Sequence, residues 1–84
     1  MQSRLYIGNL PHAATEDGLR LLFARFGTVR SATIVTDKIH GRRRRFGFVE
    51  MSSAAEAKSA IGRLNMTQYE DTVMSVSLAK IDQK

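Results

Sequence analysis

Apolar and polar residues follow two different periods along this chain, and the changes of period outline its elements. Alternation with a period of two predicts strands, whereas apolar residues at i, i+3, i+4 and i+7 predict helices. The predicted elements, in order, are a strand at 5–10, a helix from 15 to 26, strands at 29–36 and 44–51, a helix from 53 to 64 and a strand at 73–79. Residues 37–43 and 66–72, which are mostly polar, are expected to form loops.

Local signals mark the ends of both predicted helices. Thr15 is a favourable N-cap for the first helix, and Gly27 is expected to stop it. In the second helix, Ser53 and Glu56 have the spacing of a capping box. The core between the helices and the strands is expected to contain seven apolar side chains, namely Ile7, Leu22, Phe23, Phe26, Val49, Ile61 and Val76. Met74 and Leu78 are also expected to face inward from the last strand.

The strand at 44–51 has two different faces. Alternation puts Arg44, Phe46, Phe48 and Glu50 on one face and Arg45, Gly47, Val49 and Met51 on the other. The second face suits a hydrophobic core. The first presents two aromatic rings beside a cation, a combination on which nucleic-acid bases can stack while a phosphate is neutralised. A structural alternative is that both rings are buried under another element.

Composition excludes several classes of function. The 84 residues suffice for one domain, and the chain contains no cysteine, so neither a disulfide framework nor a thiolate metal site is expected. No apolar run is long enough to span a membrane, and no signal peptide is recognisable at Met1. His12 and His40 lie outside any nucleophile or metal-binding pattern. We therefore expect a cytoplasmic protein that is not an enzyme and has no metal or cofactor.

The net charge of +5 is concentrated in one segment. Residues 37–45 contain five of the 13 basic side chains and only one of the eight acidic side chains. Such a local excess suggests contact with a polyanion, although a basic run is also often solvated surface.

Two short motifs resemble those of the RNA-recognition motif (RRM) family. The sequence RRFGFVEM at 44–51 is similar to its ribonucleoprotein octamer, and LYIGNL at 5–10 is similar to its hexamer. The octamer departs from the family pattern at Arg45, where the family has glycine, and at Met51, where it has an aromatic residue. Both positions lie on the face assigned to the core.

The order of the predicted elements and the resemblance imply the same α+β fold. The order βαββαβ is that of a ferredoxin-like split β-α-β fold, with a four-stranded antiparallel sheet and two helices on one face. We expect one RRM domain over residues 1–84, with a core from about 4 to 80, similar to small single-domain bacterial and cyanobacterial RNA-binding proteins. In the family the octamer and hexamer strands are adjacent, which implies that Tyr6, Phe46 and Phe48 lie together.

The resemblance implies a monomer that binds single-stranded RNA, with single-stranded DNA as a further ligand. The expected stacking residues are Tyr6, Phe46 and Phe48. The expected phosphate contacts are Arg4, Arg42, Arg43, Arg44 and Lys80, and the expected polar contacts to bases are Asn9, Thr33, Glu50 and Ser77. The alternative function is an RRM-like domain that binds a peptide rather than RNA, although such domains commonly lack the stacking aromatics.

Overall fold

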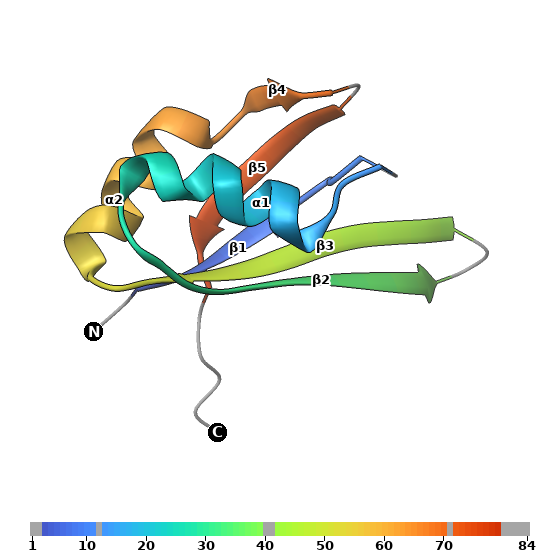
Figure 1. The fold of residues 1–84 in the computed structure, drawn as a ribbon. Coiled ribbons are helices and arrows are strands. Elements are labelled where there is room, and N and C mark those ends of the chain that lie inside the picture. Colours follow the sequence, from blue (N-terminus) through green and yellow to red (C-terminus); the bar gives the residue numbers. More distant parts are fainter. Residues whose placement is uncertain (1–2, 12, 40–41, 71, 80–84) are drawn as a thin grey trace.

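A computed structural model describes residues 3–11, 13–39, 42–70 and 72–79, and for residues 37–39 and 42–44 it describes the backbone alone. Each helix is preceded by a strand and followed by a pair of strands (Figure 1). The elements are β1 (Arg4–Gly8), α1 (Glu16–Phe23), a 3-10 turn (Ala24–Phe26), β2 (Val29–Ile39), β3 (Arg42–Met51), α2 (Ala54–Leu64), β4 (Thr67–Tyr69) and β5 (Thr72–Leu78).

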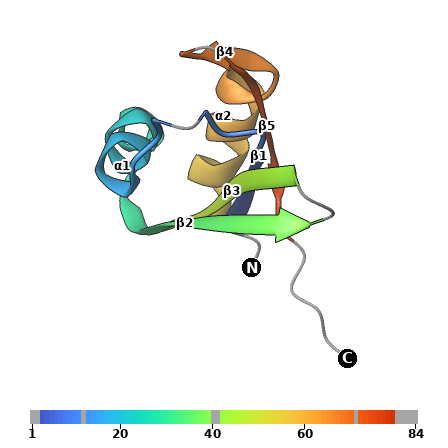
Figure 2. The ribbon, with the colours of Figure 1, turned by 90° about the vertical axis from the view of Figure 1, so that its right-hand side faces the viewer.

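One antiparallel sheet in the order β2-β3-β1-β5-β4 forms the first layer, and both helices form the second (Figure 2). Helix α1 packs against β2, and α2 packs against β5 and β3. The split β-α-β arrangement predicted from the sequence is therefore confirmed. We call the side of the sheet opposite the helices the open face.

The prediction of four strands is wrong, because residues 67–69 form the additional strand β4. Thr67 pairs with Met74 and Tyr69 pairs with Thr72, so β4 and β5 make a hairpin where a loop was expected. Its turn includes Glu70 at φ 60°, in the left-handed region that glycine or asparagine usually occupies. Glutamate gave no signal for such a turn, which is why the hairpin was missed.

The predicted loop at 37–43 is also wrong, since β2 and β3 continue through most of it. Their pairing extends from Val29 opposite Met51 to Ile39 opposite Arg42. Arg42, Arg43 and Arg44 thus belong to a strand, and Figure 1 shows the β2–β3 hairpin reaching beyond α1. Polar composition alone does not exclude a strand, because the hydrogen bonds of a ladder join backbone groups.

Both predicted N-caps are confirmed. Thr15 Oγ1 accepts a hydrogen bond from Gly18 N at 3.0 Å, and Ser53 Oγ accepts one from Glu56 N at 3.2 Å. The Glu56 carboxylate does not complete the expected capping box but accepts hydrogen bonds from Ser52 Oγ at 2.6 Å and Thr28 N at 3.3 Å. It therefore ties the start of α2 to the residue before β2.

The first helical segment ends at Gly27, as predicted. Gly27 has φ 154°, and a Cβ atom there would overlap the side chain of Glu56. Because β2 is the outermost strand on its side, its edge needs hydrogen-bond partners. Helix α1 supplies some of them: Glu16 Oε2 accepts from Ile34 N at 3.1 Å, and Arg20 Nη1 donates to Val29 O at 3.3 Å.

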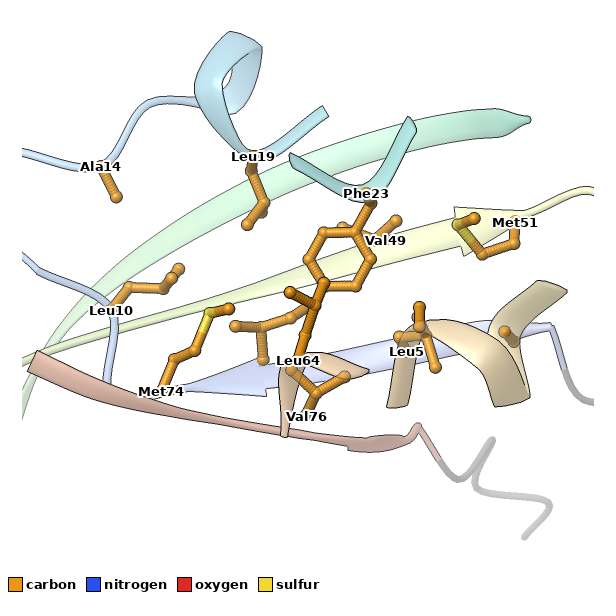
Figure 3. Packing of buried hydrophobic residues seen from close by; sticks show 13 residues of the cluster. Leu5, Leu10, Ala14, Leu19, Phe23, Val49, Met51, Leu64, Met74 and Val76 are labelled. Carbon is orange, nitrogen blue, oxygen red and sulfur yellow. The ribbon is translucent and has the colours of Figure 1, made fainter. Parts of the chain in front are cut away.

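The hydrophobic core lies between the sheet and the helices, and Figure 3 shows Phe23 of α1 directed toward Val49 and Leu64. Of the seven predicted core residues, four are buried and three are partly buried against them; the buried four are Ile7, Phe23, Val49 and Val76, and the others are Leu22, Phe26 and Ile61. Met74 is buried as expected.

The inward position predicted for Leu78 is only partly correct. Leu78 pairs with the buried Leu5, yet its side chain is 42% exposed. It borders an open hollow with Ala54, Ala55 and Lys58, at the start of α2.

Candidate nucleic-acid interface

Three aromatic side chains form a cluster on the open face, which we call the ring cluster (Tyr6, Phe46 and Phe48). Its ring centroids are 5.7 Å apart for Tyr6 and Phe46, 5.8 Å for Tyr6 and Phe48, and 5.9 Å for Phe46 and Phe48. All three side chains are partly buried, whereas their strand neighbour Val49 is fully buried on the other face. The predicted face assignment is confirmed, and the alternative that the rings belong to the core is wrong.

Strand pairing fixes this cluster. β1 and β3 are adjacent and antiparallel, and Tyr6 lies directly opposite Phe48. Directly opposed residues point to the same face, so the Tyr6 and Phe48 rings are neighbours. Phe46 shares this face because it lies two residues before Phe48 on β3. The Tyr6 and Phe46 planes differ by 34°, while Phe48 lies at 62° to Tyr6 and 90° to Phe46. Two rings therefore share a similar orientation and the third stands edge to face with them, a favourable aromatic geometry.

Gly8 leaves room for the Tyr6 ring. A Cβ atom on Gly8 would lie 3.2 Å from Tyr6 Cε2 and 2.8 Å from Ser75 Oγ. The Tyr6 ring thus extends along β1 toward Gly8, with the Ser75 hydroxyl beside it. Neither residue was among the predicted site residues; the strand period of two, which puts both on the open face, was the signal that could have identified them.

Three of the predicted polar residues border the ring cluster. Thr33 is opposite Phe48 on β2 and exposed, and Ser77 is opposite Tyr6 on β5 and exposed. Glu50, which is opposite Arg4, is partly buried. Hydroxyl and carboxylate groups therefore lie on either side of the rings.

Asn9 has a structural contact. It adopts φ 61°, and its Nδ2 donates a 2.8 Å hydrogen bond to Val73 O. This bond joins the end of β1 to β5, 64 positions later in the sequence. Asparagine is one of the few residues other than glycine that tolerate this backbone conformation.

The predicted basic residues are only partly within the described structure. Arg4 lies on β1 with its Cζ atom 4.8 Å from the centroid of the Phe48 ring. The side chains of Arg42, Arg43 and Arg44, and the whole of Lys80, lie outside the described residues. In the strand, Arg44 is opposite Asp37 and Arg43 is opposite Lys38.

Arg45 points away from the ring cluster, as its position in the strand predicted. Its Nη1 donates to Pro11 O at 3.2 Å and its Nη2 donates to Ala14 O at 3.1 Å. Its own carbonyl oxygen accepts a 3.1 Å hydrogen bond from Leu10 N. The sequence did not indicate this role, in which Arg45 joins β3 to the segment between β1 and α1.

The described residues contain neither a candidate metal centre nor a candidate membrane span. No three His, Cys, Asp or Glu side chains among them are grouped so that they could hold a metal ion. In the same part of the chain, no helix has the length and apolar character needed to cross a bilayer.

Related proteins match most of the chain. RbpA of Nostoc sp. is 41% identical over 76 residues, covering 90% of this chain and 74% of RbpA. The chloroplastic RNA-binding protein CP33 of Arabidopsis thaliana is 40% identical over 80 residues, 95% of this chain. The chain spans only 24% of the length of CP33.

Solved structures agree with the fold. The crystal structure of RNA binding protein PG1 superimposes with a TM-score of 0.83 at 34% identity, covering 98% of this chain and 99% of that one. A structure of a Sxl-lethal protein/RNA complex gives a TM-score of 0.79 at 37% identity, covering 92% of this chain and 47% of that one.

The family model described as the RNA recognition motif matches residues 5–75. This match includes β1 except its first residue, both helices, β2, β3 and β4, and the first part of β5. The resemblance inferred from the octamer and hexamer is confirmed, and the family consists of binding modules rather than enzymes. The chain belongs to the RNA recognition motif family.

Proposed function

We propose that this chain binds single-stranded RNA by stacking bases on the ring cluster. The observation that carries the proposal is the contact of Tyr6, Phe46 and Phe48 on the open face, with all three ring centroids within 5.9 Å of one another. Rings of this kind offer flat surfaces that stack on any base, at roughly 1–3 kcal/mol per base. The RNA-binding names of PG1 and CP33 and the RNA in the Sxl-lethal complex support this assignment.

Single-stranded RNA fits this surface better than a duplex does. Stacking on a protein ring requires a base that is not already stacked and paired, and in an RNA duplex the base edges are poorly accessible. Single-stranded DNA presents the same base faces, so we expect it to bind as a second ligand. We further propose that the chain acts as one monomeric RNA-binding unit in the cytoplasm.

Phosphate contacts are proposed for the basic residues near the ring cluster. Arg42, Arg43 and Arg44 belong to β3, which also carries Phe46 and Phe48. A backbone that crosses the rings therefore passes close to these positions. Arg4, at the opposite end of the sheet, and Lys80, which lies outside the described residues, are the remaining candidates.

Polar contacts to base edges are proposed for Thr33, Glu50 and Ser77, which border the rings. Their hydroxyl and carboxylate groups can accept hydrogen bonds from base amino groups or, for the hydroxyls, donate to base carbonyls. Asn9 remains a candidate through its amide oxygen, because its Nδ2 already donates to Val73 O.

The first test removes one ring at a time. Phe46→Ala and Tyr6→Ala should each weaken binding of a short mixed-sequence RNA by roughly 1–3 kcal/mol, while the melting temperature stays close to that of the parent. Leu21→Ala is the matched control, since Leu21 on α1 is 71% exposed and lies away from the open face. Ring variants that remain folded and bind RNA as the parent does would reject base stacking, and peptide binding would then be the stronger hypothesis.

The second test separates charge from stacking. Each phosphate contact on a single strand contributes about 0.7 to the slope of log affinity against log salt concentration. Replacing Arg42, Arg43 and Arg44 with Gln should therefore reduce that slope by up to about 2, whereas Phe46→Ala should leave it unchanged. A control variant with the same change in net charge replaces three exposed cations on the helix side, Arg25, Lys58 and Arg63. Equal slopes for the two triple variants would show that the arginine run is ordinary solvated surface.

A further inference from the structure

Arg4 occupies a distinctive position on the open face. It is the first residue of β1, it is exposed, and it lies opposite Glu50 in the pairing of β1 with β3. Its guanidinium carbon is 4.8 Å from the centroid of the Phe48 ring. This distance is within the range of a cation–π contact, in which the cation lies over the face of the ring.

Phe48 is consequently surrounded by three groups. The Tyr6 and Phe46 rings contact it edge to face, at interplanar angles of 62° and 90°. The Arg4 guanidinium lies over the ring itself. A base that approaches this end of the ring cluster from solvent thus meets Arg4 together with Phe48. The other two rings, Tyr6 and Phe46, have similar orientations to each other.

We propose that Arg4 is a base-stacking residue, in which the guanidinium group held over Phe48 provides a flat surface for one RNA base. This inference rests on the proposed function, and it replaces the phosphate contact proposed above for Arg4 with base stacking, so that at Phe48 the base meets the guanidinium rather than the ring. A guanidinium is planar and weakly hydrated, so it can stack on a ring with one face and on a base with the other. Because Phe48 already holds the group in place, little further ordering is needed when the base arrives.

Replacing Arg4 with lysine distinguishes base stacking by the guanidinium from a contact that depends on its positive charge alone. Arg4→Lys keeps the positive charge but replaces the planar group with a compact ammonium, which cannot form a flat stacking surface. Arg4→Lys should weaken RNA binding about fivefold or more. This factor corresponds to the lower end of the range for losing one stacked base. The slope of log affinity against log salt should remain that of the parent, because the number of cations is unchanged.

A double-mutant cycle tests whether Arg4 acts through Phe48. If Phe48 positions the guanidinium, Arg4→Lys should cost much less in a Phe48→Ala background than in the parent. Arg30→Lys is the matched control, since Arg30 is an exposed arginine on the outer strand β2. Thermal melts of the two single variants, the double variant and Arg30→Lys are measured in parallel, so that a variant that has lost its fold is recognised.

The experiment measures binding of a short mixed-sequence single-stranded RNA at several salt concentrations. Arg4→Lys binding equal to that of the parent would overturn the proposal and return Arg4 to a simple charge contact. Tighter binding would also overturn it, because it would mean that a base displaces Arg4 and stacks directly on Phe48. In both cases Phe46→Ala still weakens binding if the proposed function holds; if Phe46→Ala has no effect either, the proposed function itself fails.

Discussion

Replacing Arg45 with the glycine typical of the family should destabilise this protein. Arg45 donates to Pro11 O at 3.2 Å and to Ala14 O at 3.1 Å, and its backbone carbonyl accepts from Leu10 N. Its side chain is partly buried, so these bonds are shielded in part from water. Arg45→Met removes the guanidinium and keeps an unbranched apolar side chain, which makes it the cleaner variant for measuring the contribution of the two hydrogen bonds.

The expected loss of stability in Arg45→Met depends on the two hydrogen bonds that are removed and on the contacts that the variant keeps. Hydrogen bonds to a charged group contribute about 1.5–3 kcal/mol each, so these two bonds together contribute at most roughly 3–6 kcal/mol. Methionine avoids the desolvation of a partly buried charge, and Pro11 O keeps its 3.1 Å hydrogen bond from Ala14 N. We therefore expect Arg45→Met to lower the free energy of unfolding by about 2–3 kcal/mol. Arg45→Gly should cost about 0.5–1 kcal/mol more, because glycine disfavours the strand.

Thermal and urea denaturation measure this effect. For a domain of this size, a loss of 2–3 kcal/mol corresponds to a fall in melting temperature of roughly 10–20 °C. Arg30→Met is the control, because Arg30 is exposed on β2 and its replacement should change stability by less than about 0.5 kcal/mol. If Arg45→Met and Arg30→Met unfold at the same urea concentration, the guanidinium bonds contribute no net stability and the reasoning is refuted.

Three further predictions use the same urea series. Phe23→Ala should lower the free energy of unfolding by about 3–5 kcal/mol, because Phe23 is fully buried at the centre of the core. A loss no larger than that of Leu22→Ala, at the partly buried neighbouring residue, would contradict this central position. Asn9→Ala should lower the free energy of unfolding by about 1–2 kcal/mol, because it removes the hydrogen bond to Val73 O and leaves alanine strained at φ 61°. Asn9→Gly should lower it less, because glycine relieves that strain. The reverse order would show that backbone strain is unimportant at this position. Gly62→Ala should stabilise the protein by about 0.5–1 kcal/mol, since among the described residues no atom beyond its chain neighbours and the backbone of α2 itself lies within 4 Å of the added Cβ. Any loss of stability would mean that this helix turn is constrained in another way.

Most of the fold could be predicted from the sequence because its period changes are strong. The two faces of β3 follow from alternation alone: Val49 and Met51 are buried, and Phe46 and Phe48 lie on the opposite side. The caps at Thr15 and Ser53 follow from residue type and spacing. These features depend on neighbours a few positions apart in the sequence, where local stereochemistry decides the outcome.

The features that were missed depend on contacts between distant segments or on unusual backbone conformations. The β4–β5 hairpin turns through Glu70 at φ 60°, which its residue type does not indicate. The Arg45 bonds to Pro11 and Ala14 span 34 and 31 positions of sequence. The Asn9 bond to Val73 spans 64 positions. No periodicity within one segment can reveal which carbonyl a side chain will meet across the sheet.

The Asn9 and Arg45 contacts bear on how the ring cluster works. The chain leaves β1 directly after Tyr6 and Gly8, and Asn9 ties that exit to β5, on one side of β1. Arg45 ties the following residues to β3, on the other side. The end of β1 where the chain leaves the sheet is thus fixed to both neighbouring strands.

Stacking on rings that are already held in place loses less conformational entropy than stacking on rings that must first be ordered. Arg45→Met should therefore weaken RNA binding even at temperatures where the variant is fully folded, although Arg45 lies on the face opposite the ring cluster. If the folded variant binds with the affinity of the parent, the ring cluster is held by β1–β3 pairing alone and these outer ties serve stability only.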